Sequence, residues 1–577
     1  MSAPRRRLEV FLIRPTKYDD DGYLLRHFRG VLPSNTLACL HALTEDVAAR
    51  GVLGSVSVHT HLCDESVEAV PDREIRRAAR RGGTRVVICL VGAQTSQFPR
   101  TMDLAQRFRA LGLSVLVGGF HVSGTMAMLV DTPAELRTLR DLGATLVAGE
   151  VETIWGQILC DAAQGTLAPS YNTLDVLPVL TNAPIPRLQP RTLQRFVHRH
   201  FGTIDASRGC PFSCSFCTII NVQGRSMRAR NAETLVEAIL DNYRQNGTRD
   251  YFFTDDDFAR NPQWKEIFAR LIHLRADQNL PLRFLMQADL LAHGIPGFVE
   301  QAAHAGCFQV FLGMESLNPD SLRDGGKRQN RVADYAALVD TWHRAGILTH
   351  VGYVIGFPHD TPESVRANLR SLRDDVRPDV ASFFMLTPLP GSRDHRELVD
   401  AGVPLDADLN RYDTFHPIVA HPRMSRDEWH SLYREAWSDF YDTKVMVRQM
   451  QHAPAAQRAT LLQIYLWYGA AVRVESFHPM MTGFLRLRPR RDRRTGQRPE
   501  GWWRHARRRL PEITAAVHGY LGLLRDLEGV WRQASPAPFS GMVSRWTEFL
   551  RALFIEESSA TPRAPLRCNS SGEPLSP

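Results

Sequence analysis

The stretch Ser207–Thr218, with the sequence SRGCPFSCSFCT, is the most informative part of this 577-residue chain. It sets Cys210, Cys214 and Cys217 in a C-x3-C-x2-C pattern, directly after a strand expected at Thr203–Ala206. Iron–sulfur clusters need soft thiolate ligands, so three cysteines on one short loop can bind three irons of a [4Fe–4S] cluster and leave the fourth iron open. The sequence therefore predicts a metal cluster with one exchangeable position at the end of a strand.

Three other interpretations of these cysteines compete with the cluster. A structural zinc site would need a fourth Cys or His at ligand spacing, and Cys307 is far away, near the start of an expected buried strand. A redox pair would leave one cysteine unexplained. Chance clustering of buried cysteines would not explain the aromatic and glycine residues around them.

Six strand-like segments alternate with helical stretches over residues 201–424. A tandem of six βα units predicts a partial (β/α)6 barrel, similar to a TIM barrel, with its chemistry at the carboxyl ends of the strands. The expected strands are Thr203–Ala206, Asp250–Thr254, Arg283–Gln287, Phe308–Gly313, His350–Ile355 and Ala381–Leu386.

Residues 1–165 also alternate strands and helices. Apolar runs without polar alternation predict a parallel sheet covered on both faces, which is a doubly wound, Rossmann-type α/β domain. Its ligand should lie beyond the carboxyl ends of the strands, at the loops GAQTSQ (92–97), GGFHVSG (118–124) and GEVE (149–152). No G-x-G-x-x-G follows the first strand, which removes the main support for a nicotinamide or flavin site.

The remaining segments complete the predicted organisation. A proline-rich linker is expected at 166–200, a helical C-terminal domain at 425–557 and a disordered tail at 558–577. The start of the chain does not read as a secretion signal, and no apolar run is long enough for a membrane-spanning helix. Nine cysteines without a disulfide framework then predict a cytoplasmic protein.

The cysteine motif, with an aromatic residue before its last cysteine, resembles that of the radical S-adenosylmethionine (SAM) superfamily. The resemblance covers about residues 201–391 and implies that the open iron binds SAM, which is then cleaved to a 5′-deoxyadenosyl radical. It implies no catalytic residues beyond the cluster ligands Cys210, Cys214 and Cys217. The positions that match SAM-contacting residues of the family are Asp255, Asp256, Gln287, Glu315, Ser316 and Gly356.

The family's usual Gly-Gly-Glu is absent at Asp255–Asp257, and these carboxylates could equally cap a helix. Asp360 stands where a Glu is usual in the family, and it also fits an ordinary helix start. The SAM contacts are therefore weaker predictions than the cluster ligands.

The first domain resembles the cobalamin-binding domain of one subgroup of these enzymes, through the segments VLVGGFH and AGEVET. The resemblance implies a corrin-binding crevice. It also implies a reaction in which methylcobalamin methylates an unactivated carbon of a small-molecule, lipid or peptide substrate, with a reductant such as flavodoxin or ferredoxin. The Asp-x-His-x-x-Gly motif for an axial histidine is absent, and His121 is more simply a capping or solvent-facing residue. The matching positions are Thr95, Ser96, Gly118, Gly119, His121, Gly149 and Glu150.

Two rival functions stay open at this point. Members of the same subgroup also perform rearrangement, cyclisation or oxidation. A more remote rival is a metal-stabilised protein that binds nucleic acid through the segment 486–509, which has eleven arginines and two acidic residues around Trp502 and Trp503. The simpler interpretation of that segment is a solvated stretch packed on the rim of the enzyme, so nucleic acid is not the expected partner.

Overall fold

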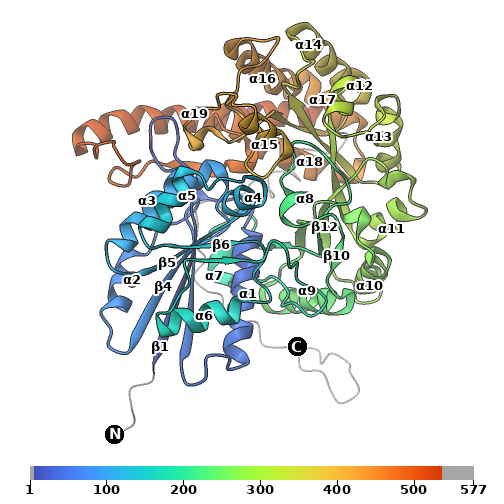
Figure 1. The fold of residues 1–577 in the computed structure, drawn as a ribbon. Helices are drawn as coiled ribbons and strands as arrows, with labels where there is room; N and C mark the ends of the chain where they lie inside the picture. Colours follow the sequence, from blue (N-terminus) through green and yellow to red (C-terminus); the bar gives the residue numbers. More distant parts are fainter. Residues whose placement is uncertain (1–5, 536–577) are drawn as a thin grey trace.

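The first part of the chain is built on a six-stranded parallel sheet in the order β3-β1-β4-β5-β6-β7. The strand order reverses between β1 and β4, the position where doubly wound folds bind ligands. The structure is a computed structural model that describes residues 6–535 (Figure 1). The strands are β1 (Arg7–Arg14), β3 (Ser57–Asp64), β4 (Thr84–Leu90), β5 (Ser114–Gly118), β6 (Thr145–Ala148) and β7 (Ser170–Asn172).

Helices cover both faces of this sheet, which confirms the predicted doubly wound domain. Apolar side chains of α1 and α6 pack on one face, and those of α2 to α5 pack on the other. The sheet also gains β7 inside the predicted linker at 166–200, because this segment pairs with the edge strand β6. The helices are α1 (Asn35–Ala49), α2 (Asp72–Ala79), α3 (Phe98–Arg109), α4 (Phe120–Met128), α5 (Ala134–Asp141), α6 (Trp155–Gln164) and α7 (Pro190–Leu193).

The second part is a partial barrel of six parallel strands in the order β15-β14-β13-β12-β11-β8. These are the six predicted strands, and β8 and β15 form the two edges of the open barrel. The strands are β8 (Phe201–Ile204), β11 (Asp250–Phe253), β12 (Arg283–Ala288), β13 (Cys307–Glu315), β14 (Leu348–Ile355) and β15 (Val380–Met385). A two-stranded ribbon of β9 (Ser207–Arg208) and β10 (Arg228–Ala229) lies between β8 and β11 in the chain.

Amphipathic helices connect the barrel strands. Helix α9 begins at Asn231, whose side chain accepts the N–H of Thr234, and α14 begins with a capping box of Thr361 and Ser364. The helices are α8 (Ile219–Val222), α9 (Ala232–Asn246), α10 (Trp264–Ala276), α11 (Phe298–Ala305), α12 (Pro319–Asp324), α13 (Tyr335–Arg344), α14 (Pro362–Ser371) and α15 (Arg393–Asp400).

The third part is helical, as predicted, and packs on the β15 edge of the barrel. Trp437 and Phe440 of α16 contact Phe383 of β15 edge-to-face, at ring-centroid distances of 5.2 and 5.8 Å. The predicted tail at 558–577 lies outside the described residues. The elements are α16 (Arg426–Phe440), α17 (Thr443–His452), α18 (Arg458–Gly469), β16 (Phe484–Leu487) and α19 (Trp502–Ala534). Among residues 6–535, none of the helices is both apolar and long enough to cross a bilayer.

The segment after β1 ties the three parts together. Strand β2 (Arg26–Arg29) pairs antiparallel with β16, so the beginning of the chain forms a ribbon with the C-terminal region. Nearby, Lys17 and Asp413 form an ion pair in which each side chain is almost fully buried. His416 joins the pair, with Nδ1 2.9 Å from the carboxylate of Asp413 and Nε2 3.5 Å from that of Asp20.

This cluster predicts a pH dependence of stability. Burial alone would lower the pKa of His416, but the carboxylates of Asp20 and Asp413 raise it to about 9. A histidine whose pKa is raised on folding stabilises the native state at any pH below its pKa in the unfolded chain, roughly 6.5. This stabilisation is lost as the pH rises through its pKa in the folded protein. We therefore expect the Tm to fall between pH 6.5 and 9, and to fall less in His416→Gln. An equal slope in both proteins, measured by calorimetry, would contradict this assignment.

Candidate active site

The loop that carries the three cysteines is held at several points by the backbone of the barrel. Its first residues form β9, and the N–H of Cys210 donates to the carbonyl of Gly224 at 3.2 Å. Further along, the N–H of Ser215 donates to the carbonyl of Gly325 at 3.0 Å. Gly326 has a φ of +73°, and a Cβ there would lie 2.6 Å from the carbonyl oxygen of Ser213. Backbone hydrogen bonds and the close packing of Gly326 therefore hold the loop against the barrel.

Asp255 at the end of β11 fixes the start of this loop. Its carboxylate accepts a hydrogen bond from the N–H of Ala206 at 2.8 Å and another from the hydroxyl of Ser207. Burial raises the pKa of Asp255 to about 7, although these hydrogen bonds oppose the shift. Both carboxylate oxygens are thus occupied by the protein, so Asp255 is placed to orient the cluster loop.

The three thiols are not gathered as closely as the ligands of one zinc ion would be. A tetrahedral zinc ion with Zn–S bonds of about 2.3 Å would bring cysteine sulfurs to roughly 3.8 Å from one another. Within residues 6–535, the one triad of candidate ligand atoms closer than 4.8 Å is Asp340, His343 and His452, on α13 and α17. The three cysteine sulfurs are therefore more widely spaced than one zinc ion requires.

The protonation of the thiols also fits a site that depends on metal. Burial raises the pKa of Cys210 to about 12 and that of Cys217 to about 11, and it also raises the pKa of Cys214. Thiolates are the species that bind iron, so the charge of the metal must drive their ionisation.

Asp256 and Gln287 lie beside the cluster loop. After burial, the negative charge of Asp256 is one of the smaller causes that raise the pKa of Cys210 and of Cys217, so its carboxylate lies near both thiols. Burial raises the pKa of Asp256 to about 7, and the neighbouring charge of Asp255 adds to the shift. A cationic ligand group would favour the charged form of Asp256, so a SAM ammonium suits this position. Gln287 donates to the carbonyl of Asp255 at 3.0 Å.

Glu315 pairs with Lys327, a residue that the sequence analysis missed. Glu315 has a φ of +62°, unusual for a residue with a side chain, and its carboxylate lies 2.9 Å from the Lys327 ammonium. Burial would lower the pKa of Lys327, but Glu315 and the thiols of Cys214 and Cys217 raise it above its ordinary value. The only sequence signal was the preceding Gly325-Gly326, which packs against the cysteine loop. Lys327 thus brings a positive charge beside the ligands of an anionic cluster.

Ser316 and Gly356, also predicted to contact SAM, are engaged in packing. Ser316 is buried, and its hydroxyl accepts from the N–H of Asn318 at 3.0 Å. Gly356 has a φ of +108°, and a Cβ on it would lie 2.1 Å from the indole of Trp429 in α16. The N–H of Gly356 donates to Asp360 at 2.8 Å. The close approach that requires glycine at this position is therefore made by Trp429.

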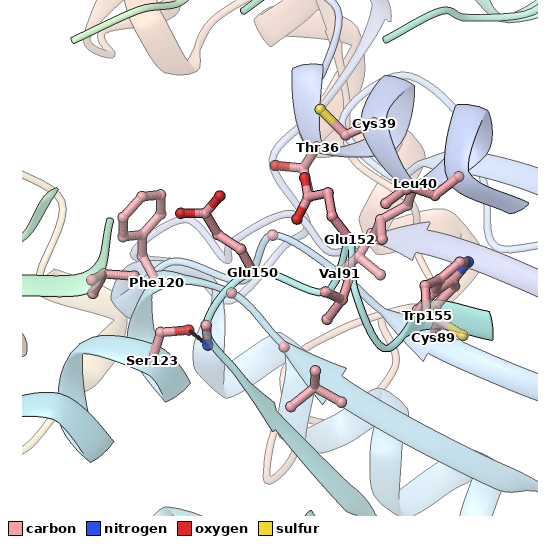
Figure 2. Close-up of a pocket in the computed structure, with 18 of the residues that line it drawn as sticks. Thr36, Cys39, Leu40, Cys89, Val91, Phe120, Ser123, Glu150, Glu152 and Trp155 are labelled. Atoms are coloured by element: carbon pink, nitrogen blue, oxygen red, sulfur yellow. Dashed lines mark hydrogen bonds between the residues drawn. The ribbon is translucent and has the colours of Figure 1, made fainter. Parts of the chain in front are cut away.

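A cavity opens between the first domain and the barrel. It contains about 970 Å³ of space, including part that is open to solvent. Figure 2 shows Phe120 and Ser123 of α4 beside Glu150, with Thr36 and Cys39 of α1 opposite them. The predicted residues that line it are Gly118, Gly119, Gly149 and Glu150, and Arg208, Val222 and Gln223 close it from the barrel side.

The position and the lining of the cavity are compatible with a corrin ring. It lies at the carboxyl ends of β4, β5 and β6, and its walls are mostly apolar side chains and glycine backbone. Its opposite side is built by residues next to the cysteine loop. The donor set and the apolar lining therefore suit a mostly apolar cofactor held between the two domains.

Thr95, Ser96 and His121, which were also predicted to contact cobalamin, do not line this cavity. All three are buried, and Nδ1 of His121 lies 3.2 Å from the hydroxyl of Thr95. The imidazole packs on Phe98 at 4.0 Å, and its Nε2 lies 3.4 Å from Glu135. His121 points away because it is the second residue of α4, and the first residue, Phe120, faces the cavity instead. No histidine is among the described residues that line the cavity.

Arg208 joins the cavity to the cysteine loop. Its guanidinium lies 2.7 Å from Glu150, 2.6 Å from Glu152 and 3.0 Å from Asp205. Arg228 of β10 pairs with Glu150 as well. Both glutamates belong to the GEVE loop of the first domain, so this buried network fixes the first domain against the barrel two residues before the first cluster cysteine. The sequence analysis named Glu150 but not its arginine partners.

Residues 204–372 match the family described as the Radical SAM superfamily. The match contains the whole cysteine loop and the strands β11 to β14. The barrel is therefore a radical SAM domain, as the cysteine motif predicts.

Individual proteins extend the similarity to the rest of the chain. Bacteriochlorophyllide d C-12(1)-methyltransferase of Chlorobaculum tepidum is 25% identical over 374 residues, which cover 64% of this chain and 77% of that protein. The structure of the radical SAM methyltransferase TsrM from Kitasatospora setae, with cobalamin and a [4Fe–4S] cluster bound, has a TM-score of 0.53 at 18% identity, covering 80% of this chain and 99% of TsrM. OxsB, a cobalamin-dependent SAM radical enzyme with aqua-cobalamin and SAM bound, has a TM-score of 0.53 at 15% identity, covering 95% of this chain and 84% of OxsB. The two structures establish that the fold of this chain is shared beyond the barrel.

The packing of Gly356 yields a test of the site. Gly356→Ala would place a methyl group against Trp429 in a backbone conformation that disfavours side chains, and we expect it to cost roughly 2–4 kcal/mol of stability. Gly346→Ala is the matched control, because Gly346 has a φ of +80° but no atom lies within 4 Å of the place that a Cβ would take. It should cost only about 1 kcal/mol. Equal losses of Tm in the two variants would show that Trp429 does not constrain this position.

Proposed function

We propose that this chain is a cobalamin-dependent radical SAM enzyme that transfers a methyl group to an unactivated carbon. One observation carries the proposal: the cysteine loop of the barrel and the glycine-lined cavity of the first domain meet at Arg208. A cofactor in the cavity would therefore face a cofactor on the cysteine loop. Methyl transfer in particular is supported because both the Chlorobaculum relative and TsrM are methyltransferases.

The cofactors supply the reactive chemistry, and the chain supplies ligands, orientation and shielding. When bound to the three cysteines, a [4Fe–4S] cluster supplies the electron that cleaves SAM, and a cobalamin supplies the carrier of the methyl group. Cys210, Cys214 and Cys217 would hold the cluster, while Lys327 compensates its negative charge. We assign the ammonium group of SAM to the carboxylate of Asp256.

The surroundings of the site agree with this chemistry. None of the eight described cysteines forms a disulfide, which suits a reducing compartment, and we assign the protein to the cytoplasm on that basis. A one-electron donor such as flavodoxin or ferredoxin completes the proposed system. The substrate is a small molecule, a lipid or a peptide.

The cluster assignment is tested by anaerobic reconstitution with iron and sulfide, followed by incubation with SAM and dithionite. We expect the wild-type protein to bind iron and to release 5′-deoxyadenosine, and Cys214→Ser to lose both to background, because two thiolates cannot hold the cluster. Cys160→Ser is the matched control, since Cys160 is a part-exposed thiol of α6 outside the loop. A folded wild-type protein that binds zinc and leaves SAM intact would overturn the proposal.

The cobalamin assignment has a separate readout. Thr36 lines the cavity and is exposed, so Thr36→Trp should fill the space without disturbing the core, and we expect several-fold less cobalamin to remain after gel filtration. The control Thr166→Trp places the same ring at another exposed threonine. Equal retention of cobalamin in both variants would show that this cavity is not the cobalamin site. The cluster assignment would be unaffected, because it is tested separately by SAM cleavage.

A methylated product, detected by mass spectrometry with isotopically labelled SAM, separates methyl transfer from other radical reactions. Formation of 5′-deoxyadenosine together with a rearranged or oxidised product that lacks the labelled methyl group would contradict methyl transfer. The radical SAM assignment would remain intact.

A further inference from the structure

The outward face of α19 is a stripe of exposed apolar side chains. Trp503, Leu510, Val517 and Leu521 recur at intervals of seven, seven and four residues, which places them on one side of a helix. Trp503 is 80% exposed, Leu510 68% and Leu521 57%. The complete stripe, called here the outer stripe, consists of Trp502, Trp503, Leu510, Ile513, Val517 and Leu521.

The packing of α19 on the fold is made by other residues, in the part of the helix that follows the stripe. Leu523, Leu527 and Val530 are buried against the other C-terminal helices. Figure 1 shows α19 as a long helix whose one end projects beyond the neighbouring elements. The outer stripe is therefore not needed to hold the described part of the fold together.

The charge beside the outer stripe is positive. Arg504, Arg507 and Arg525 are exposed and have no ion pair with any residue in the range 6–535. The one acidic residue between Trp502 and Arg525 is Glu512, which is occupied by Arg488, Arg508 and Arg509. The helix thus presents apolar side chains flanked by uncompensated arginines.

Most of the other arginines in the segment 486–509 are engaged within the protein. Arg486 pairs with Asp19, and Arg494 lies 2.7 Å from Asp408. Arg508 lies 3.2 Å from Glu500. These pairs explain why the segment packs on the rim of the enzyme. The exposed arginines of the segment without an ion pair among residues 6–535 include Arg504 and Arg507 of α19, and Arg491 and Arg498 in the loop before it.

We propose that the outer stripe rests on the surface of a lipid bilayer that contains anionic lipids, with α19 parallel to the membrane plane. Apolar and tryptophan side chains enter the boundary of the acyl chains, and flanking arginines contact anionic headgroups, which is how interfacial helices bind. The outer stripe spans 20 residues of this helix and offers a contact about 30 Å long. This inference is independent of the proposed function.

Charge and shape favour a bilayer over two other occupants. In a second copy, the α19 helices would bring arginines together without acidic residues opposite them. In a nucleic-acid site, aromatic side chains would stack on the bases along the contact, whereas Leu510, Val517 and Leu521 make most of this face aliphatic.

The test is co-flotation of the full-length protein with vesicles of phosphatidylcholine alone or with 30% phosphatidylglycerol. We expect binding to the mixed vesicles that weakens as NaCl is raised to 0.5 M, because salt screens the arginines. Leu510→Gln, Val517→Gln and Leu521→Gln together should weaken partitioning about tenfold or more, because each removes apolar surface from the bilayer contact. Arg504→Gln with Arg507→Gln should reduce the preference for the anionic lipid severalfold, because two of the unpaired arginines beside the stripe are lost.

The matched control is a triple variant of exposed valines away from α19: Val130→Gln, Val176→Gln and Val179→Gln. It should bind like the wild type, and circular dichroism checks that every variant is folded. Absence of vesicle binding, or binding that the α19 triple variant does not change, overturns the proposal. If the wild type does not bind vesicles but forms a dimer that the α19 triple variant dissociates, the stripe is an interface with a second copy. If the wild type does not bind vesicles but captures a single-stranded oligonucleotide through its arginines, the stripe belongs to a nucleic-acid site.

Discussion

The buried network around Arg208 fixes the relation between the two halves of the candidate site. Arg208 is part of the strand that leads into the cysteine loop, and its partners Glu150 and Glu152 belong to the first domain. Asp205 holds the same guanidinium from the barrel side and also pairs with Arg230. Removing one member of such a network leaves a buried charge without its partner, which typically costs about 3–5 kcal/mol. The position of the cavity relative to the cysteines therefore depends on a small set of charges, and the apolar cores of the two domains only support it.

Much of the fold could be predicted from the sequence because both parallel sheets are buried on both faces. Strands such as Arg85–Val91 and His350–Ile355 are short apolar runs between amphipathic helices, and the pattern identifies them without knowledge of the partners. The cysteine loop was equally readable, because its three ligands are adjacent in sequence. β7 was missed, because Ser170–Asn172 is a short polar edge strand whose only signal is its pairing with β6.

The parts of the site that were not predicted depend on contacts between distant segments. Lys327 reaches Glu315 and the cysteine loop through the fold of the barrel, and a lysine after two glycines has no distinctive pattern. Gly356 resembled a ligand contact in sequence, but the residue that crowds it, Trp429, is supplied by a helix 73 positions later. The glycine-rich sequence around His121 does not predict where its side chain points. The rotation of α4 about its axis decides whether Phe120 or His121 faces the cavity.

The ribbon between β2 and β16 also has a consequence for biosynthesis. Asp19 pairs with Arg486, which follows 467 positions later in the chain. At roughly 5–20 residues per second, a ribosome needs on the order of half a minute to a minute and a half to add that length. During this time the first domain can form its own sheet, whereas the segment around Lys17 and Asp19 has unpaired charges until the C-terminal region emerges. The first domain therefore begins to fold first, but its contacts are completed only when the C-terminal region has been synthesised. Until then, the chain exposes a loop that is buried in the complete protein.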